Sequence, residues 1–233
     1  EVDMGSLGNR ETFDSKLADP EVRRQFLEKG RELGLEICSL AMSGFYAQSF
    51  AKRPTYRKMV EDCIRTMALM NVKNAFLPLG VQGDLVQHPE LRPAIVKRLR
   101  TVGRAAERSN VVIGIETALD ARGEAALLDE VASPAIRSYF NFANPLEAGR
   151  DVCEELHVLG KNRICQIHCT DRDGVHLENN RRLNLHEVKQ TLDELDWSGW
   201  LVMERSRDAN NPRDVVGNYG ANASYLQSVF QDR

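Results

Sequence analysis

The sequence lacks the features of a membrane protein and of a nucleic-acid-binding protein. No apolar run approaches the roughly 20 residues that a membrane-spanning helix needs. The sequence also lacks a large excess of charge of either sign. It has 31 Lys and Arg residues and 34 Asp and Glu residues, for a net charge of -3. Such a balance gives no overall attraction to nucleic acid or to an anionic membrane. These absences predict a soluble protein whose partner is a small molecule.

A disulfide framework and a structural zinc site are not indicated either. The five cysteines are odd in number and show no C-x-x-C spacing: Cys38, Cys63, Cys153, Cys165 and Cys169. Free cysteine is commonly buried, so we expect Cys165 and Cys169 to be buried residues of a strand. No G-x-G-x-x-G or G-x-x-x-x-G-K-[ST] loop follows any predicted strand, which disfavours a doubly wound nucleotide-binding sheet.

The chain does contain enough apolar sequence for one large domain. Its 233 residues are 42% hydrophobic and 28% charged, which is typical of a compact globular protein. We therefore predict a single domain over residues 1–233. The opening residues 1–4 resemble the tail of a strand, so a leading segment is expected to be missing. A cytoplasmic location is the default, but a lost signal peptide leaves the compartment open.

Predicted strands alternate with predicted helices along the whole chain. The strand candidates are residues 1–4, 35–40, 74–80, 111–116, 137–144, 163–170 and 200–204, and the helix candidates are 20–33, 54–70, 89–108, 123–131, 147–159, 185–195 and 212–230. This alternation calls for a parallel sheet with helices outside it. Seven strands and a truncated front predict an α/β fold, a (β/α)₈ TIM barrel that lacks its first strand and helix in this chain; such barrels typically have about 250 residues.

Local signals support several of these helices. Asp19-Pro20-Glu21 reads as an N-cap, a proline in the first turn and an acid, and Gly34 is a stop signal. The apolar positions Met59, Ile64, Met67 and Met70 recur at helical spacing and are expected to be core. The basic run of the helix from Pro89 is expected to be a solvated face.

Four predicted strands end in polar side chains that can bind a metal ion: Glu116, Asn141, His168 and Glu204. In a (β/α)₈ barrel the carboxyl ends of the strands converge on the active-site mouth. A carboxylate at the end of an apolar strand is costly to desolvate unless it is paired or ligates a metal. Two carboxylates, an imidazole and an amide oxygen suit Mn²⁺ or Mg²⁺ best, with Co²⁺ or Zn²⁺ as alternatives.

The same residues carry a resemblance to a known family. Gly-Ile-Glu-Thr at 114–117, Asn141 in Tyr-Phe-Asn-Phe-Ala-Asn, Ile-His-Cys-Thr-Asp at 167–171 and Trp-Leu-Val-Met-Glu-Arg at 200–205 resemble, in this order, the xylose isomerase-like TIM barrel superfamily. This group includes sugar isomerases, ketose 3-epimerases and inosose-processing enzymes, as well as AP endonuclease 2-type barrels. The resemblance implies a divalent metal ion held by Glu116, Asn141, His168 and Glu204, with Glu116 and Glu204 also acting as acid and base.

Several positions depart from the family pattern. Asn141 stands where the family has Asp, which lowers the ligand charge, and Asn144 stands where ketose 3-epimerases have a histidine that contacts the substrate. Their second glutamate corresponds to Arg122, and Arg172 only lies near the position of their loop arginine. The residues expected to contact the substrate are Asn144, Asp171, Arg172, Gln166 and His88. Arg122, Arg172 and Arg205 are expected on the surface; an arginine facing the mouth would favour an anionic substrate.

Three functions remain open after these departures. The first is a metal-dependent isomerase or epimerase of a sugar or cyclitol, with proton transfer by Glu116 and Glu204 through an enediolate. The second is a metal-dependent lyase or dehydratase on a keto-sugar or inosose, and the third is a non-catalytic sugar-binding relative. The expected partner is a small carbohydrate or cyclitol, with a homo-oligomer possible and with no nucleic acid or membrane. A multi-zinc endonuclease is disfavoured, because only one of five histidines lies in a strand-end motif.

Overall fold

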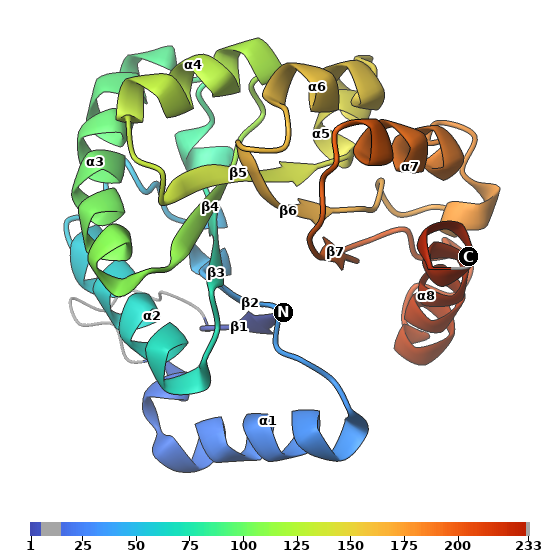
Figure 1. The fold of residues 1–233 in the computed structure, drawn as a ribbon, viewed down its shortest axis with the longest axis horizontal. Helices are drawn as coiled ribbons and strands as arrows, with labels where there is room; N and C mark the ends of the chain where they lie inside the picture. The colour runs from blue at the N-terminus through green and yellow to red at the C-terminus, as the bar shows by residue number, and fades with distance from the viewer. Residues whose placement is uncertain (6–14, 232–233) are drawn as a thin grey trace. The chain divides into compact units, whose positions relative to one another are not determined.

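The computed structural model describes residues 1–5 and 15–231, and these form an α/β fold of parallel strands (Figure 1). The strands of the described residues follow chain order: β1 (Val2–Asp3), β2 (Ser39–Ala41), β3 (Asn74–Pro78), β4 (Val112–Glu116), β5 (Ile136–Asn141), β6 (Ile164–His168) and β7 (Leu201–Val202). Every pairing with a resolved register is parallel. The predicted fold class is therefore confirmed.

Helices connect successive strands, as a parallel arrangement requires. They are α1 (Pro20–Leu33), α2 (Tyr56–Met70), α3 (Arg92–Ser109), α4 (Ala121–Val131), α5 (Ala143–Glu147), α6 (Val152–Leu159), α7 (Leu185–Glu194) and α8 (Val215–Phe230), with 3₁₀ turns η1 (Lys16–Ala18), η2 (Ser43–Tyr46), η3 (Val81–Gly83), η4 (Pro89–Leu91) and η5 (Leu177–Asn179). No helix of the described residues is long and apolar enough to cross a membrane.

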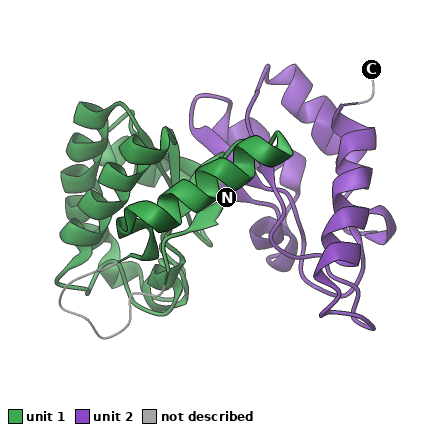
Figure 2. Ribbon diagram, turned by 90° about the horizontal axis from the view of Figure 1, so that it is seen from below, with its two compact units in different colours: residues 1–119, 123–139 green, residues 120–122, 140–233 purple. Residues whose placement is uncertain are grey.

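The chain forms two compact units, which Figure 2 colours separately. Unit 1 contains residues 1–119 and 123–139, and unit 2 contains residues 120–122 and 140–233. Strand β5 begins in unit 1 and ends in unit 2. Each unit has its own set of strand ends, and these ends carry the polar residues of interest.

The core of unit 1 lies between its strands and helices α2 and α3, which run side by side (Figure 1). The predicted apolar stripe of α2 is buried, with Met59, Ile64, Met67 and Met70 all at most 7% exposed. Burying such side chains is worth about 1.5–3 kcal/mol each before entropy costs. The prediction that this stripe is core is confirmed.

Helix boundaries follow the local signals where these are strong. The Asp19 carboxylate accepts the Glu21 N–H at 2.8 Å, Pro20 opens α1, and Gly34 ends it with a φ of 65°. The predicted helix over 147–159 is wrong in its first half. Gly149 adopts a φ of 69°, and the helical segment divides into α5 and α6, the latter capped by Asp151. A left-handed residue ends a helix whatever the apolar pattern around it.

The basic face of α3 also differs from its prediction in one residue. The Arg98 guanidinium donates hydrogen bonds of 2.6 Å to the carbonyls of Phe50 and Arg53 and lies 4.2 Å from the ring centroid of Tyr56. Arg98 therefore fastens the loop before α2, whereas the prediction made it part of a solvated face. The carbonyls of a loop are acceptors that a sequence pattern does not reveal.

Candidate active site at the strand ends

In unit 1 the candidate residue is Glu116, the last residue of β4. It is only 8% exposed, and its backbone carbonyl accepts the Leu79 N–H at 3.1 Å. The Tyr46 hydroxyl, from η2, donates to the Glu116 carboxylate at 2.9 Å. The preceding strand β3 runs beside it in register, with Pro78 opposite Glu116. The carboxylate is thus buried and oriented by a hydroxyl group, as a functional carboxylate requires.

In unit 2 the candidate residues are His168 and Glu204. His168 ends β6 with 2% exposure, and its backbone carbonyl accepts the Phe142 N–H at 3.0 Å. Glu204 lies two residues beyond β7, with its side chain 25% exposed. The His168 Nδ1 atom is 3.9 Å from the Glu204 Oε2 atom. The imidazole and the carboxylate therefore lie close together in a partly buried position, where charges interact more strongly than in water.

Asn141, the last residue of β5, completes this group in unit 2. Its Oδ1 atom accepts the Ala143 N–H at 2.9 Å, and its Nδ2 atom donates to Glu204 Oε2 at 3.2 Å. The amide therefore caps the turn into α5 while its nitrogen faces Glu204. An amide oxygen has two lone pairs and can therefore accept more than one bond.

The thiol of Cys169, the residue after His168, is not a candidate metal ligand or nucleophile. Cys169 is fully buried, and burial raises the pKa of its thiol to about 12. The thiol stays neutral at physiological pH and is a poor ligand and nucleophile in that form. Cys169 is buried as predicted but lies one residue beyond β6, whereas Cys165, on β6, is only half-buried.

The other predicted residues have different surroundings. Asp171 is 2% exposed and organises its own loop: it accepts the Arg172 N–H at 2.7 Å and the Asn180 side-chain amide at 2.9 Å, and lies 3.6 Å from Arg182 Nε. Gln166 is fully buried on β6, Asn144 is half-buried on α5 and Arg172 is exposed. His88, in unit 1, precedes η4 and lies 3.3 Å from the Glu90 carboxylate.

Three hydroxyl groups around the glutamates were not predicted. Tyr46 contacts Glu116, while Thr170 and Tyr219 contact the backbone of Glu204. Tyr46 belongs to an aromatic-containing loop that the sequence did reveal, but nothing in the sequence pairs it with a residue of β4. Thr170 lies on the same strand face as His168, which was the one available signal.

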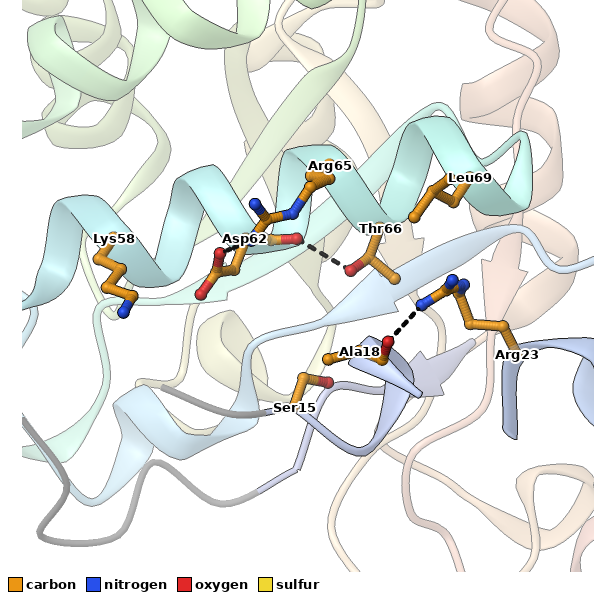
Figure 3. Close-up of a pocket in the computed structure, with 8 residues that line it drawn as sticks. All are labelled: Ser15, Ala18, Arg23, Lys58, Asp62, Arg65, Thr66 and Leu69. Carbon is orange, nitrogen blue, oxygen red and sulfur yellow. Dashed lines mark hydrogen bonds and ion pairs between the residues drawn. The ribbon is translucent and has the colours of Figure 1, made fainter. Parts of the chain in front are cut away.

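Unit 1 also has a separate surface cavity of about 350 Å³ beside α2, with basic side chains on its wall (Figure 3). Arg23 donates to the carbonyls of Leu17 and Ala18 at 2.6 and 2.8 Å, and Arg65 pairs with Asp62. These cations already bind groups of the protein itself. The cavity brings together no histidine, cysteine or pair of carboxylates among the described residues, so we do not assign it a catalytic role.

Alternating parallel strands and helices, with acids, an amide and a histidine at the strand ends, are the features of a (β/α)-barrel domain. The family model for the xylose isomerase-like TIM barrel matches residues 2–228, and the chain belongs to this family. The match spans both units. A search of curated proteins finds no match.

Solved structures of sugar epimerases share the fold. They include 3-keto-D-glucoside 4-epimerase from E. coli (TM-score 0.72, 16% identity, 89% of this chain and 85% of that chain). L-ribulose 3-epimerase gives a TM-score of 0.71 at 13% identity, covering 91% of this chain and 82% of the other. D-psicose 3-epimerase from Clostridium cellulolyticum H10 gives 0.71 at 14% identity, covering 90% and 84%. At these identities the likeness concerns the fold.

Proposed function

We propose that the protein is a divalent-metal-dependent isomerase or epimerase of a sugar or cyclitol. The observation that carries the proposal is the pair of buried His168 and half-buried Glu204, 3.9 Å apart, at or just beyond the ends of the neighbouring parallel strands β6 and β7. Support comes from the family match and from solved structures of similar fold, two of which are sugar epimerases. Ligand atoms for a metal ion are available in both units, from Glu116 in unit 1 and from His168 and Glu204 in unit 2.

The donor set of these residues fits a hard or borderline cation. We propose Glu116, His168 and Glu204 as ligands, with Asn141 contributing its Oδ1 atom. Two carboxylates and one imidazole favour Mn²⁺ or Mg²⁺ and also accept Co²⁺ or Zn²⁺. When bound, such an ion supplies charge stabilisation to a sugar carbonyl and its neighbouring hydroxyl as negative charge develops there.

The two glutamates would carry the proton transfer. One carboxylate removes the proton from the carbon next to the carbonyl, and the electron pair of the broken C–H bond forms the C=C bond of an enediolate. The other glutamate, as its protonated carboxylic acid, donates a proton to the opposite face of the same carbon in an epimerase. In an isomerase it donates to the neighbouring carbon, and a proton also passes from the hydroxyl to the former carbonyl oxygen. No oxidant or reductant is consumed. Positioned carboxylates of this kind typically contribute about 10²–10⁴-fold in rate.

Metal content and proton exchange test this proposal together. We would measure divalent metal per chain and exchange of ketose and inosose C–H groups with deuterated water for wild type, His168→Ala and Glu204→Gln. Two exposed residues in the first turn of α7 provide matched controls, His186→Ala and Glu187→Gln. We expect about one ion per chain in wild type and in both controls, and loss of the ion in His168→Ala.

Absence of bound metal in wild type after incubation with excess Mn²⁺ would refute the metal-dependent proposal. The contact from the Asn141 amide nitrogen to Glu204 favours one alternative in that case, a sugar-binding relative without the metal. Bound metal with exchange but without epimer or isomer formation would instead favour the lyase or dehydratase, because that reaction shares the first proton abstraction.

A further inference from the structure

The backbone around Glu204 has left the regular strand ladder. The Ile167 N–H of β6 donates to the Trp200 carbonyl at 3.1 Å, and the N–H of Cys169, just beyond β6, donates to the Val202 carbonyl at 3.0 Å. Strand β7 itself ends at Val202. Residues beyond it need other partners for their N–H and C=O groups, because an unpaired buried backbone group is costly.

The Thr170 hydroxyl supplies the partner for two of these groups. Thr170 is 1% exposed, and its Oγ1 atom accepts the Glu204 N–H at 3.2 Å and the Arg205 N–H at 3.0 Å. One side chain thereby fixes the peptide planes on both sides of Glu204.

A second hydroxyl fixes the other side of Glu204. The Tyr219 hydroxyl, from α8, donates to the Glu204 carbonyl at 2.8 Å. Both backbone polar groups of Glu204 are therefore bound by side chains of unit 2, and neither bond depends on regular strand pairing. We call Thr170 and Tyr219 the hydroxyl clamp.

The chain immediately after the clamp is also held in place. Ser206 is fully buried with a φ of 67°, a left-handed conformation that a serine adopts only under constraint. Its hydroxyl accepts the Asp171 N–H at 3.1 Å, and the Asn222 side-chain amide donates to its carbonyl at 2.8 Å. The segment from Glu204 to Ser206 cannot rotate without breaking several bonds at once.

We propose that Thr170 and Tyr219 are positioning residues that aim the Glu204 carboxylate at the metal ion and the substrate. The inference rests on the proposed function. The clamp holds the backbone of Glu204, and the backbone position determines where its carboxylate can lie. Catalytic geometry tolerates little error, because a displacement of about 1 Å can cost on the order of 10²-fold in rate. The clamp thus provides the supporting shell that a precise site needs.

Two substitutions at residue 170 separate the hydroxyl from its bulk. Thr170→Val keeps the shape and removes the acceptor, whereas Thr170→Ser keeps the acceptor. We would titrate wild type and both variants with Mn²⁺ by calorimetry and measure kcat and KM at a temperature well below Tm. We expect Thr170→Val to bind Mn²⁺ about 10-fold more weakly and to lose about 10²-fold in kcat with little change in KM. Thr170→Ser should stay within about 3-fold of wild type in both.

Tyr219→Phe is the second variant, at a half-buried position where folding is less at risk than at Thr170. We expect a reduction in kcat of about 3- to 10-fold. Equal Mn²⁺ affinity and kcat in wild type, Thr170→Val and Tyr219→Phe, with only Tm lowered, would overturn the inference and leave the clamp a stabilising contact.

Amide hydrogen exchange tests the hydroxyl clamp separately from the proposed function. It follows the Glu204 and Arg205 N–H groups without any metal or substrate. We expect faster exchange of both in Thr170→Val than in Thr170→Ser and wild type. Wild type that binds no Mn²⁺ would refute the proposed function, while unchanged exchange in Thr170→Val would refute the clamp itself.

Discussion

The two glutamates proposed for proton transfer are held in place in different ways. Glu116 is the final residue of a five-residue strand that pairs with β3 and β5, and its own carbonyl is part of the hydrogen bonding with the β3 side. Glu204 follows a two-residue strand and depends on Thr170 and Tyr219. The backbone of Glu116 is positioned by the sheet, and the backbone of Glu204 by side-chain hydroxyls.

This difference has a consequence for mobility and for tolerance to mutation. A residue within a ladder shares its support with many neighbours, so no single side chain is essential for its backbone position. Glu204 depends on the hydroxyls of Thr170 and Tyr219, so one substitution at either residue removes a hydrogen bond to its backbone. The strand-end segment of unit 2 should therefore respond to conservative changes that the β4 end of unit 1 would absorb.

The largest effects should come from removing each carboxylate in turn. We expect Glu116→Gln and Glu204→Gln each to reduce epimer or isomer formation by about 10²–10⁴-fold. Each variant should still exchange the substrate proton that faces its remaining carboxylate, so deuterium exchange from the two substrate epimers, followed by NMR, should show opposite preferences. Wild-type product formation in either variant would remove that residue from the mechanism.

The next largest effect should come from restoring a carboxylate at the end of β5. Asn141→Asp replaces the amide nitrogen that donates to Glu204 Oε2 at 3.2 Å with a second negative charge. Like charges this close disfavour the metal-free protein, and a divalent cation between them reverses the sign. We expect a lower Tm without metal and about 10-fold tighter Mn²⁺ binding than wild type, measured by thermal unfolding and calorimetry. The exposed Asn179→Asp is the control, and equal behaviour of the two variants would argue against a metal beside Asn141.

A smaller effect is expected at the unit 1 carboxylate. Tyr46→Phe removes the hydroxyl that donates to Glu116 at 2.9 Å but leaves the backbone of β4 in its ladder. A hydrogen bond to a charged group contributes about 1.5–3 kcal/mol, part of which water replaces. We expect kcat to fall about 10-fold, while amide exchange of Glu116 stays unchanged. Tyr225→Phe on α8 is the matched control; faster exchange at Glu116 in Tyr46→Phe would mean that this carboxylate also depends on a side chain for its backbone position.

The smallest effect concerns the ion pair beyond the clamp. The Arg207 guanidinium donates to the Asp173 carboxylate and holds the pKa of that carboxyl below its usual value. A lowered pKa in the folded state adds stability above the unfolded-state pKa near 3.9, and this stability is lost as the pH falls through the lower folded value. Both side chains are more than a third exposed, so screening reduces the effect.

We therefore expect Asp173→Asn to lower Tm at pH 7 by on the order of 1 °C, with the difference from wild type shrinking below pH 4 and in high salt. Thermal unfolding at three pH values measures this. A difference that grows as the pH falls would contradict the assigned cause.

The sequence predicted most elements of the fold because their signals are local. The cap at Asp19, the stop at Gly34 and the apolar stripe of α2 each depend on residues within a few positions of one another, and each is found in the structure. The break at Gly149 was not predicted, because glycine is compatible with a helix and its left-handed conformation depends on the turn it makes here.

At the candidate site, the sequence by itself identified the polar residues at the strand ends, since an apolar strand that ends in Glu116, Asn141 or His168 is recognisable from the order of residue types. Only the tertiary structure decided which groups support them. Thr170 bonds to the N–H of Glu204, 34 positions away, and Tyr46 bonds to Glu116, 70 positions away. Such contacts depend on how the chain brings distant segments together, and a hydroxyl group carries no pattern in sequence that reveals its partner.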